Sequence, residues 1–244
     1  MGTFFYPELY RNFTLFSTSH FIMISVLTIL IVTLFLFGSR IRKNTKYQHH
    51  IRWTLFTVLV LSELSYQLWS LMNGVWDLRI HLPFHLCSIS SLAILYFLLK
   101  PNESRFQLVY FIAFLPPVLA IVTPDLLYGY PHYRFFQFFI HHMTLVVTVF
   151  YAILILRLRP KFASIFKAVF FINILALPLH YLNRSIGSNY LFLEGPPASD
   201  TLLSWFGTGY WYIINLEIVM FVAFLITYLP FMSGKIKAKK EVEM

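Results

Sequence analysis

Residues 18–38 read TSHFIMISVLTILIVTLFLFG and contain no charged side chain. A helix needs about 20 mainly apolar residues to cross the hydrocarbon layer of a bilayer. The run has that length and that composition. We therefore predict that residues 18–38 form a transmembrane helix, and that this helix decides the class of the fold.

Six further apolar runs follow along the chain. Irregular backbone is not tolerated in contact with lipid, so the class expected is all-α, with about seven transmembrane helices in a single integral membrane domain over residues 1–244. The third and fourth runs are short or interrupted by Pro116-Pro117. The long aromatic connection 183–209 predicts a lid or a re-entrant segment. The six runs are 53–72, 83–99, 107–123, 136–156, 164–182 and 210–230.

The composition agrees with this class. The chain is 58% hydrophobic and 12% charged, whereas a soluble domain carries about 25% charged residues. Its mean hydropathy is +0.69. A single cysteine excludes an internal disulfide framework and any cluster of several cysteines around a metal.

Basic residues mark the two sides of the membrane. Segments 39–52, 100–106, 157–167 and 231–244 together hold fifteen Lys and Arg, and the remaining connections hold four. Cytoplasmic loops carry the excess of Lys and Arg, so we predict an N-terminus outside and a C-terminus in the cytoplasm of a cell-membrane protein. This distribution accounts for the net charge of +9 and argues against a nucleic-acid partner.

Polar side chains gather in the outer half of the predicted helices. Ionisable groups in hydrocarbon are costly and often mark function. Seven of the nine histidines lie in this half, and only His49 and His50 fall in a predicted inner loop. We expect one cavity open to the outer leaflet; the alternative is that these groups only join helices through hydrogen bonds. The set comprises His20, Glu63, His81, His85, Cys87, Ser88, Asp125, Arg134, Gln137, His141, His142, His180, Asn183 and Glu217.

The only cysteine lies in the stretch RIHLPFHLCSISS, residues 79–91. Proline suits the first turn of a helix, so Pro83 predicts a helix start there, with Cys87 about one turn inside. The helix dipole and a nearby histidine lower the pKa of a thiol and favour the nucleophilic thiolate. The alternative is that Cys87 is a small apolar core residue.

A base for this thiol is expected from the predicted helix 136–156 and its N-terminal flank. Arg134, Gln137, His141, Thr144 and Thr148 are spaced to form one polar face, whereas His142 is turned about 100° away. A histidine that faces a cysteine takes the thiol proton and returns it to the leaving group. The spacing favours His141, and both histidines remain candidates.

A zinc site is the competing use of the same residue types. His81 and His85 are four residues apart, and another histidine or Glu63 would complete a set of three ligands. Pro83 lies between the two histidines and argues against a regular helix there. We expect no metal and no other cofactor.

Five stretches of the chain form a recognisable set: LFSTSH (15–20), LPFHLCSIS (82–90), RFFQFFIHH (134–142), LNRSIGSNYLFLEGPP (182–197) and WYIINLE (211–217). They span nearly the whole chain in order, and together they resemble the YwaF family of bacterial integral membrane proteins. That family is similar in turn to the transmembrane protein 164 group, which are membrane acyltransferases with a catalytic Cys and His. The resemblance implies that Cys87, in the L-P-x-H-L-C element, is the nucleophile, and that His141 or His142 is its partner.

The function expected is therefore a membrane acyltransferase or acyl hydrolase whose partners are membrane phospholipids or acyl-lipids. A second hypothesis is a non-enzymatic transporter or receptor for a small anionic or amphipathic ligand, and a third is an intramembrane zinc hydrolase. His85 or Asn189 would hold the oxyanion or the acceptor. The residues expected to bind substrate are His85, Asn189, Tyr190, Arg134, Gln137, His20 and Glu217.

Overall fold

The computed structural model describes residues 4–8, 10–197 and 201–242, with side chains described up to residue 232. The described residues are helical, apart from loops and a single β-bridge between Asn12 and Tyr128, which confirms the all-α class. The helices are α1 Thr18–Lys43, α2 Thr45–Met72, α3 Leu86–Leu99, α4 Glu103–Val122, α5 Tyr133–Leu154, α6 Ala163–Ile186 and α7 Gly209–Val242, with short 3-10 helices η1 Tyr190–Phe192 and η2 Leu202–Trp205.

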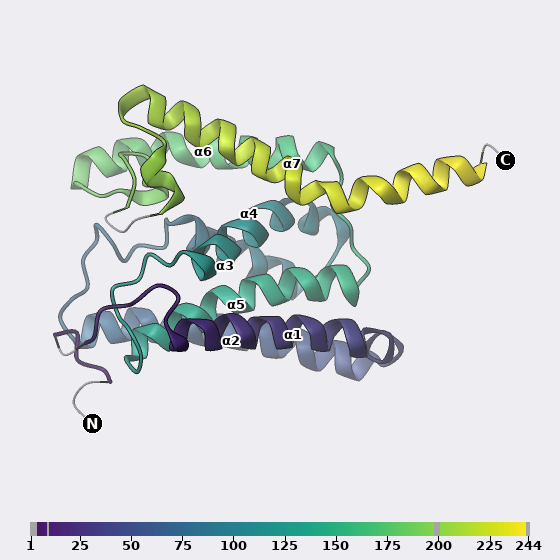
Figure 1. The fold of residues 1–244 in the computed structure, drawn as a ribbon, viewed down its shortest axis with the longest axis horizontal. Coiled ribbons are helices and arrows are strands. Elements are labelled where there is room, and N and C mark those ends of the chain that lie inside the picture. Colours follow the sequence, from purple (N-terminus) through teal and green to yellow (C-terminus); the bar gives the residue numbers. More distant parts are fainter. Residues whose placement is uncertain (1–3, 9, 198–200, 243–244) are drawn as a thin grey trace.

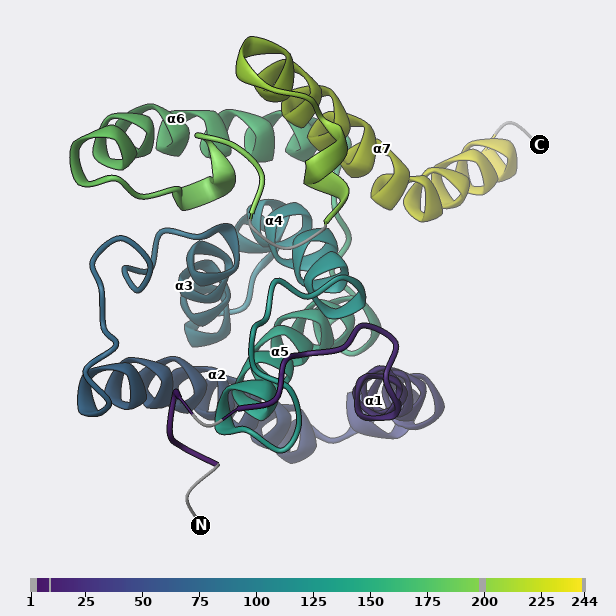
Figure 2. The same ribbon diagram turned by 60° about the vertical axis from the view of Figure 1, so that its left-hand side comes forward.

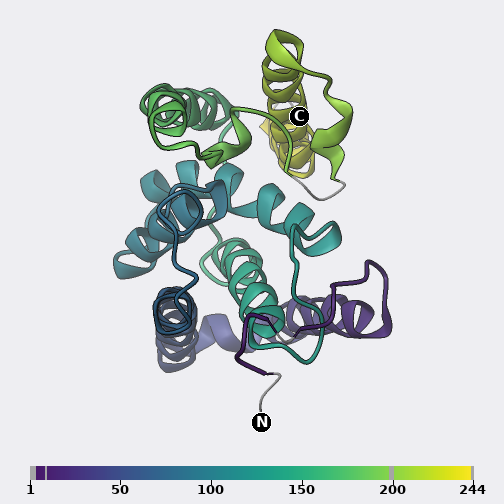
Figure 3. The ribbon, with the colours of Figure 1, turned by 90° about the vertical axis from the view of Figure 1, so that its left-hand side faces the viewer.

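The helices run roughly along the longest axis of the molecule, as Figure 1 shows. Helices α1 and α2 lie on one side, α6 and α7 lie on the other, and α3, α4 and α5 lie between them (Figure 2). Helix α5 packs against α1, α2, α3 and α4 and is the most buried of the long helices. Figure 3 shows the pair α6 and α7 set beside the rest of the bundle, which it contacts mainly through α4.

Six of the helices in the described part of the chain are long and apolar enough to cross a membrane. The exception is α3, which has 14 residues and therefore rises only about 21 Å, less than the roughly 30 Å of a hydrocarbon layer. The prediction of a helix over 83–99 was too long at its start. Pro83 lies outside the helix rather than in its first turn, and Cys87 is the second helical residue.

The reason for the late start of α3 is a contact from a distant segment. The Tyr190 hydroxyl donates to the carbonyl oxygen of Leu78 at 2.7 Å and accepts from the N–H of Leu82 at 3.0 Å. These bonds hold residues 78–82 in turns. His85 is then extended, with ψ at 152°, and acts as the N-cap residue of α3.

Several helices are longer than the sequence indicated, among them α2 and α6. Asn44 caps α2, because its side chain accepts from the N–H groups of Lys46 and Tyr47. His49 and His50 therefore lie on α2, and their placement in a loop was wrong.

Helix α6 continues to Ile186 and ends at Gly187, whose φ of 69° suits glycine. His180 and Asn183 are therefore inside α6 rather than at its end. Helix α4 runs through Pro116 and Pro117 without a break.

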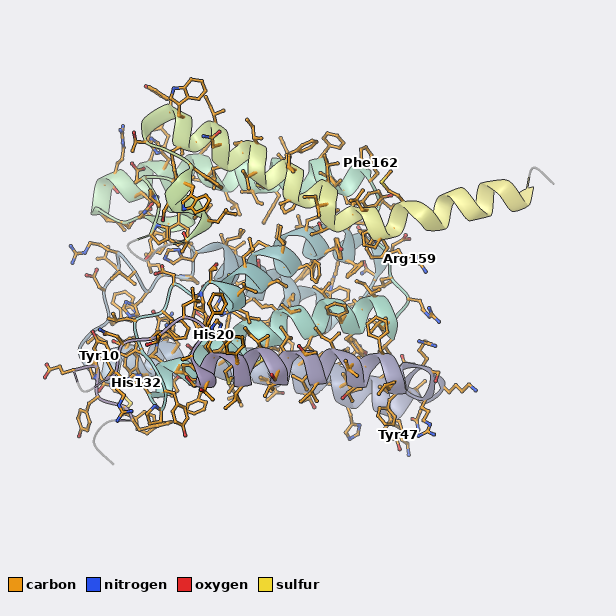
Figure 4. The ribbon with its side chains drawn as sticks, viewed as in Figure 1. Tyr10, His20, Tyr47, His132, Arg159 and Phe162 are labelled. Carbon is orange, nitrogen blue, oxygen red and sulfur yellow. The ribbon has the colours of Figure 1, made fainter. Side chains whose placement is uncertain are left out.

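The bundle has two distinct ends. Figure 4 shows Tyr10, His20 and His132 at one end, and Tyr47, Arg159 and Phe162 at the other. We call the first the histidine end; it also holds the connections 73–85, 123–132 and 187–208. We call the opposite end, with the Lys- and Arg-rich connections, the basic end. The expectation that the histidine end faces outside stays a prediction.

Reporter fusions test this orientation. Gly74 is exposed, has a φ of +66° and has no neighbouring atom near the position of an added Cβ, so an insertion there disturbs little packing. A reporter at Gly74 should read outside, and a reporter after residue 244 should read cytoplasmic. A fusion within the exposed connection after Arg159 is the matched control and should agree with the C-terminal one. Reports from the same side at Gly74 and at the C-terminus would contradict the charge argument.

Candidate functional site

A cavity of about 490 Å³ lies at the histidine end of the bundle, between α2, α3 and α5 on one side and α4, α6 and α7 on the other. The connection 187–208 covers it. The cavity brings together the predicted residues His85, Cys87, Arg134, Gln137, His141, His142 and Glu217. Further polar residues along its wall are Glu63, Tyr66, His81, Ser88, Thr123, Asp125 and Thr201.

Several polar groups of the cavity lie at one depth. His141 is eight residues into α5, Glu217 is eight residues into α7, and Glu63 is nine residues before the end of α2. At 1.5 Å per residue, each lies roughly 12–14 Å below the histidine end of its helix. The short α3 begins below the surface, which brings Cys87 toward the same level.

Cys87 is partly buried at the start of α3. Its helix has no side-chain cap, because His85 makes no capping hydrogen bond. The structure gives no partner, among the described residues, to the N–H groups of Leu86, Cys87 and Ser88. The first N–H groups of a helix have no intrahelical acceptor and favour negative charge. The thiol therefore lies beside unpaired donors at the wall of the cavity.

His141 is held at both ring nitrogens. Nδ1 lies 3.3 Å from the Ser62 hydroxyl on α2, and Nε2 lies 2.8 Å from the Ser91 hydroxyl on α3. The carboxylate oxygen of Glu63 is 4.0 Å from Nδ1. His141 therefore joins three helices, and both of its nitrogens already have hydroxyl partners.

The directions of these bonds follow from their other partners. The Ser91 hydroxyl donates to the carbonyl oxygen of Cys87 at 2.8 Å, so it accepts from Nε2–H of His141. The Gln137 amide donates to the Ser62 hydroxyl at 3.2 Å, and this hydroxyl then donates to Nδ1. The chain of bonds fits a neutral His141 with its proton on Nε2.

His142 is bound differently from its neighbour. Its Nδ1 lies 2.7 Å from the carbonyl oxygen of Phe138, which can only accept, so Nδ1 carries the proton. The other nitrogen, Nε2, then has the free electron pair. Among the described residues, no hydrogen bond to this nitrogen is found. His142 lines the cavity, and its Nε2 is able to accept a proton.

Arg134 places a cation at the wall of the cavity. Its guanidinium lies over the ring of Tyr66, 4.0 Å from the centroid, and it donates to the side-chain oxygen of Gln137. No carboxylate lies within ion-pair distance of it in the described part of the chain. The bond to Gln137 fixes the amide with its NH₂ group toward Ser62.

Glu217 stands on the opposite wall. Its carboxylate accepts from the side chain of Asn173 at 3.1 Å, and this bond joins α7 to α6. Glu217 thus has a structural partner as well as a place in the cavity.

Three of the predicted binding residues, His20, Asn189 and Tyr190, lie outside this cavity. His20 is fully buried, and its Nε2 bonds to the carbonyl oxygen of Ile121 at 2.8 Å, so it joins α1 to α4. The Asn189 side chain accepts from the N–H of Glu194 and donates to the carbonyl oxygen of Gly195. Asn189 holds its own loop and lines a separate hollow nearer the surface.

Tyr190 also lies outside the cavity wall, and its role is to connect two segments. It is completely buried, and its ring packs against His85 at 5.0 Å between centroids. Its hydroxyl makes the two bonds to residues 78–82 described above. Tyr190 therefore positions the segment that leads into Cys87.

The covering connection 187–208 is anchored by an ionic contact. The carboxylate of Glu194 lies 2.9 Å from Nδ1 of His180 and 3.9 Å from Nε of Arg184. Residues of this connection then line the cavity from the histidine end: Leu191, Phe192, Leu193, Pro197, Thr201, Leu202, Leu203 and Phe206. Residues 187–197 and 201–208 thus belong to a connection held to α6 through Glu194, and its function as a lid stays a prediction.

The separate hollow, about 410 Å³ in volume, shares His85, Asp125 and Phe192 with the main cavity. Arg79 lies on its rim and is paired with Asp77 at 2.5 Å. The hydrogen bond from Arg79 lowers the pKa of the Asp77 carboxyl to about 2, so both groups stay ionised at neutral pH. The positive charge of Arg79 is thus already paired with the carboxylate of Asp77.

The residues considered for zinc are committed to other contacts. Nδ1 of His81 accepts from the backbone N–H of Asp77 at 3.0 Å, and its ring stacks on Tyr66. The ring of His85 packs between Tyr190 and Phe192. Within the described ranges, no group of three or more His, Cys, Asp or Glu side chains is arranged to hold a metal ion.

Ser62 and Ser91 were missed by the sequence analysis. A signal for Ser91 was available, because it lies four residues after Cys87 and therefore on the same face of α3. Ser62 carried no comparable signal, since its role depends on the packing of α2 against α5.

One comparison with known proteins covers most of the chain. The family model of the TMEM164 family matches residues 15–228. An uncharacterized protein of Treponema pallidum (strain Nichols) is 28% identical over 153 residues, which cover 63% of this chain and 63% of that protein. The match thus spans less than two thirds of the relative. No solved structure matches the chain.

The tie made by Tyr190 can be tested by removing one oxygen atom. Tyr190→Phe loses both bonds to residues 78–82 and leaves the N–H of Leu82 unpaired, which should cost about 1–3 kcal/mol of unfolding free energy. A thermal melt in detergent should show a fall of several degrees. Tyr210→Phe is the matched control, because Tyr210 is 91% exposed, and it should leave the melt unchanged. Equal melts for the two variants would remove the role given to Tyr190.

Proposed function

The chain belongs to the TMEM164 family, and from this membership and the geometry of the cavity we propose that it is a membrane acyltransferase or acyl hydrolase acting on lipid. Its six long apolar helices support a multi-pass membrane protein. The observation that carries the proposal is the shared cavity wall of Cys87, His141 and His142, below the level of the histidine end. The activity itself is the one that the resemblance implies.

In the first half of the reaction, the Cys87 thiol loses its proton to a histidine, and the sulfur attacks the carbonyl carbon of a lipid acyl ester. A carbon–sulfur bond forms, and the ester carbon–oxygen bond breaks. The histidine returns the proton to the departing alcohol oxygen. The product is an acyl-thioester on Cys87 and a lipid that carries one acyl chain fewer.

In the second half, a hydroxyl group of an acceptor lipid, or water, loses its proton to the same histidine and attacks the thioester. The carbon–sulfur bond breaks, and the sulfur takes the proton back. The protein is a transferase if the acceptor is a lipid hydroxyl group and a hydrolase if the acceptor is water. No electrons are gained or lost, so no redox cofactor is needed.

We assign the base to His142. A base needs a ring nitrogen with a free electron pair, and His142 has one because its other nitrogen donates to Phe138. Both nitrogens of His141 are occupied by Ser62 and Ser91. His141 then acts as a positioning residue that holds α3, and thus Cys87, against α2 and α5.

The start of α3 supplies stabilisation for the oxyanion. As the carbonyl carbon becomes tetrahedral, its oxygen gains negative charge, and backbone N–H groups aimed at it lower the barrier. The N–H groups of Cys87 and Ser88 are suited to this, because α3 has no side-chain cap. Arg134 adds a positive charge to the same cavity. Asn189, expected to contribute here, is committed to its own loop.

The lipid headgroup fits the histidine end of the cavity. This end carries the polar groups and the hollow around His85 and Asp125, and it lies nearest the membrane surface. If the basic end is cytoplasmic, as the charge distribution indicates, the substrate is drawn from the outer leaflet of a cell membrane.

The nucleophile is tested by Cys87→Ser. The two side chains have similar volumes, so expression and melting temperature should not change. Acyl adducts at position 87, detected by mass spectrometry, and lipid turnover should fall by orders of magnitude, because a hydroxyl is a far weaker nucleophile than a thiolate. The control His49→Ala changes an exposed residue at the basic end and should be silent. Full lipid turnover in Cys87→Ser would show that the thiol is not the nucleophile and would leave Cys87 as a packing residue.

The two histidines should separate in a matched pair of variants. His142→Gln removes the basic nitrogen and should slow acylation of Cys87 by about 10²–10⁴-fold. His141→Gln keeps groups able to bond with Ser62 and Ser91, so acylation should slow less than about tenfold. The rates are read from the appearance of the adduct. The reverse order would assign the base to His141.

A further inference from the structure

We propose that the deep part of the cavity is a chamber for a single acyl chain, and that Ala176 and Ala223 set the chain length it accepts. This inference rests on the proposed function and names the part of the substrate that the cavity selects. It concerns the walls on α4, α6 and α7, which the chemistry at Cys87 does not use.

The cavity changes in character along its depth. Toward the histidine end its wall carries the ionisable groups described above. Below the level of Glu217, the wall on α6 and α7 is apolar and consists of Ile172, Ala176, Val219, Met220, Ala223 and Phe224. A site with a polar mouth and an apolar interior fits an amphipathic molecule with its apolar chain pointing inward.

The chamber has a floor. Ile172 is 14 residues from the end of α6, and Ala223 is 14 residues from the start of α7, so both lie roughly 21 Å below the histidine end. Phe224 beside them is 2% exposed, and its ring packs on that of Phe111 at 5.3 Å. These aromatic rings close the cavity toward the basic end.

The width of the chamber depends on small side chains. Ala176 on α6 and Ala223 on α7 both line the cavity, about 6 Å apart in depth by the helical rise. Helices α6 and α7 contact each other and α4. A side chain larger than alanine at either position would extend into the cavity. Either residue is therefore placed to limit how far a chain reaches.

The positions required of the two ends of an acyl chain identify it, as part of the reacting ester, as the occupant of the chamber. The carbonyl must reach Cys87 at the start of α3, roughly 9 Å or more above the floor by the helical rise from Glu217 to Ala223. The chain attached to that carbonyl then extends into the apolar part. A polar or branched ligand would place polar atoms against Met220 and Phe224 without partners.

The binding affinity of the protein for probes of different chain length tests the chamber without requiring catalysis. Each buried methylene adds about 0.8 kcal/mol, or about a fourfold gain in affinity. We use the full chain with Cys87→Ala, which cannot form a thioester, and titrate it with monohexanoyl glycerol and monodecanoyl glycerol. These probes have the same headgroup and differ only in chain length. Bound probe is measured by native mass spectrometry in detergent.

In this background, Ala223→Phe should exclude about three methylenes and lower the affinity for the decanoyl probe roughly 60-fold. The affinity for the hexanoyl probe should change less than about twofold, because the shorter chain ends above the block. Phe224→Leu lowers the floor and should act in the opposite direction, with a gain for the decanoyl probe and none for the hexanoyl probe. Ile226→Phe is the matched control on the exposed face of α7, 59% exposed, and should leave both affinities unchanged.

The outcomes separate the two proposals. If the length preference shifts as described while Cys87→Ser keeps full activity, the chamber stands and the thiol chemistry is wrong. If Cys87→Ser is inactive but Ala223→Phe lowers the affinities for both probes equally, or for neither, the chamber is overturned and the thiol chemistry stands. Failure of Ala223→Phe to fold is met by Ala223→Leu, which should shift the preference in the same direction by a smaller amount.

Discussion

The arrangement of the cavity depends on the shortness of α3. A helix of 14 residues cannot cross the hydrocarbon layer, so about a third of the thickness along its path must be filled by other backbone. Irregular backbone at that depth is tolerated only where protein covers it and satisfies its polar groups. The segment 73–85 meets this condition through Tyr190 and through Gln67, which donates to the carbonyl oxygen of His81. The result is a helix start set back from the histidine end, whose first N–H groups have no acceptor among the described residues.

The polar groups around that helix start form one connected network of hydrogen bonds. Arg134 orients Gln137, Gln137 bonds to Ser62, and Ser62 bonds to His141. Each buried polar group that lacked its partner would cost free energy, so the network favours one arrangement of α2, α3 and α5. His142 stands beside this network without a partner on Nε2 among the described residues. A proton acceptor that stands beside such a network with a free electron pair is suited to general-base chemistry.

The sequence predicted the class of the fold because apolar runs of membrane length have few other interpretations. It also identified most of the polar residues of the cavity wall, since polar residues at similar depth on several helices tend to meet. The helix ends were harder, because they depend on contacts from far along the chain. Pro83 matched a helix start by local preference, but Tyr190, more than a hundred residues later, holds that segment in turns.

His20 and Asn189 show that polarity alone does not identify a residue of the functional site. Each is a polar residue at the expected depth, and each satisfies a backbone group instead of facing the cavity. The distinction between His141 and His142 likewise could not come from helical spacing. It rests on which atoms of neighbouring helices lie beside each ring nitrogen, and spacing along α5 does not contain that information.

The way α6 and α7 join the bundle bears on how the protein is made. This pair packs on the earlier helices mainly through α4, whereas α1 to α5 share extensive contacts with one another. Because a ribosome delivers the N-terminal part first, the five earlier helices can pack together before the last two are synthesised. The last pair then brings the second wall and the covering loop to a platform that already holds Cys87. Biosynthesis thus forms the enclosed chamber last, and a truncated chain presents its thiol without one.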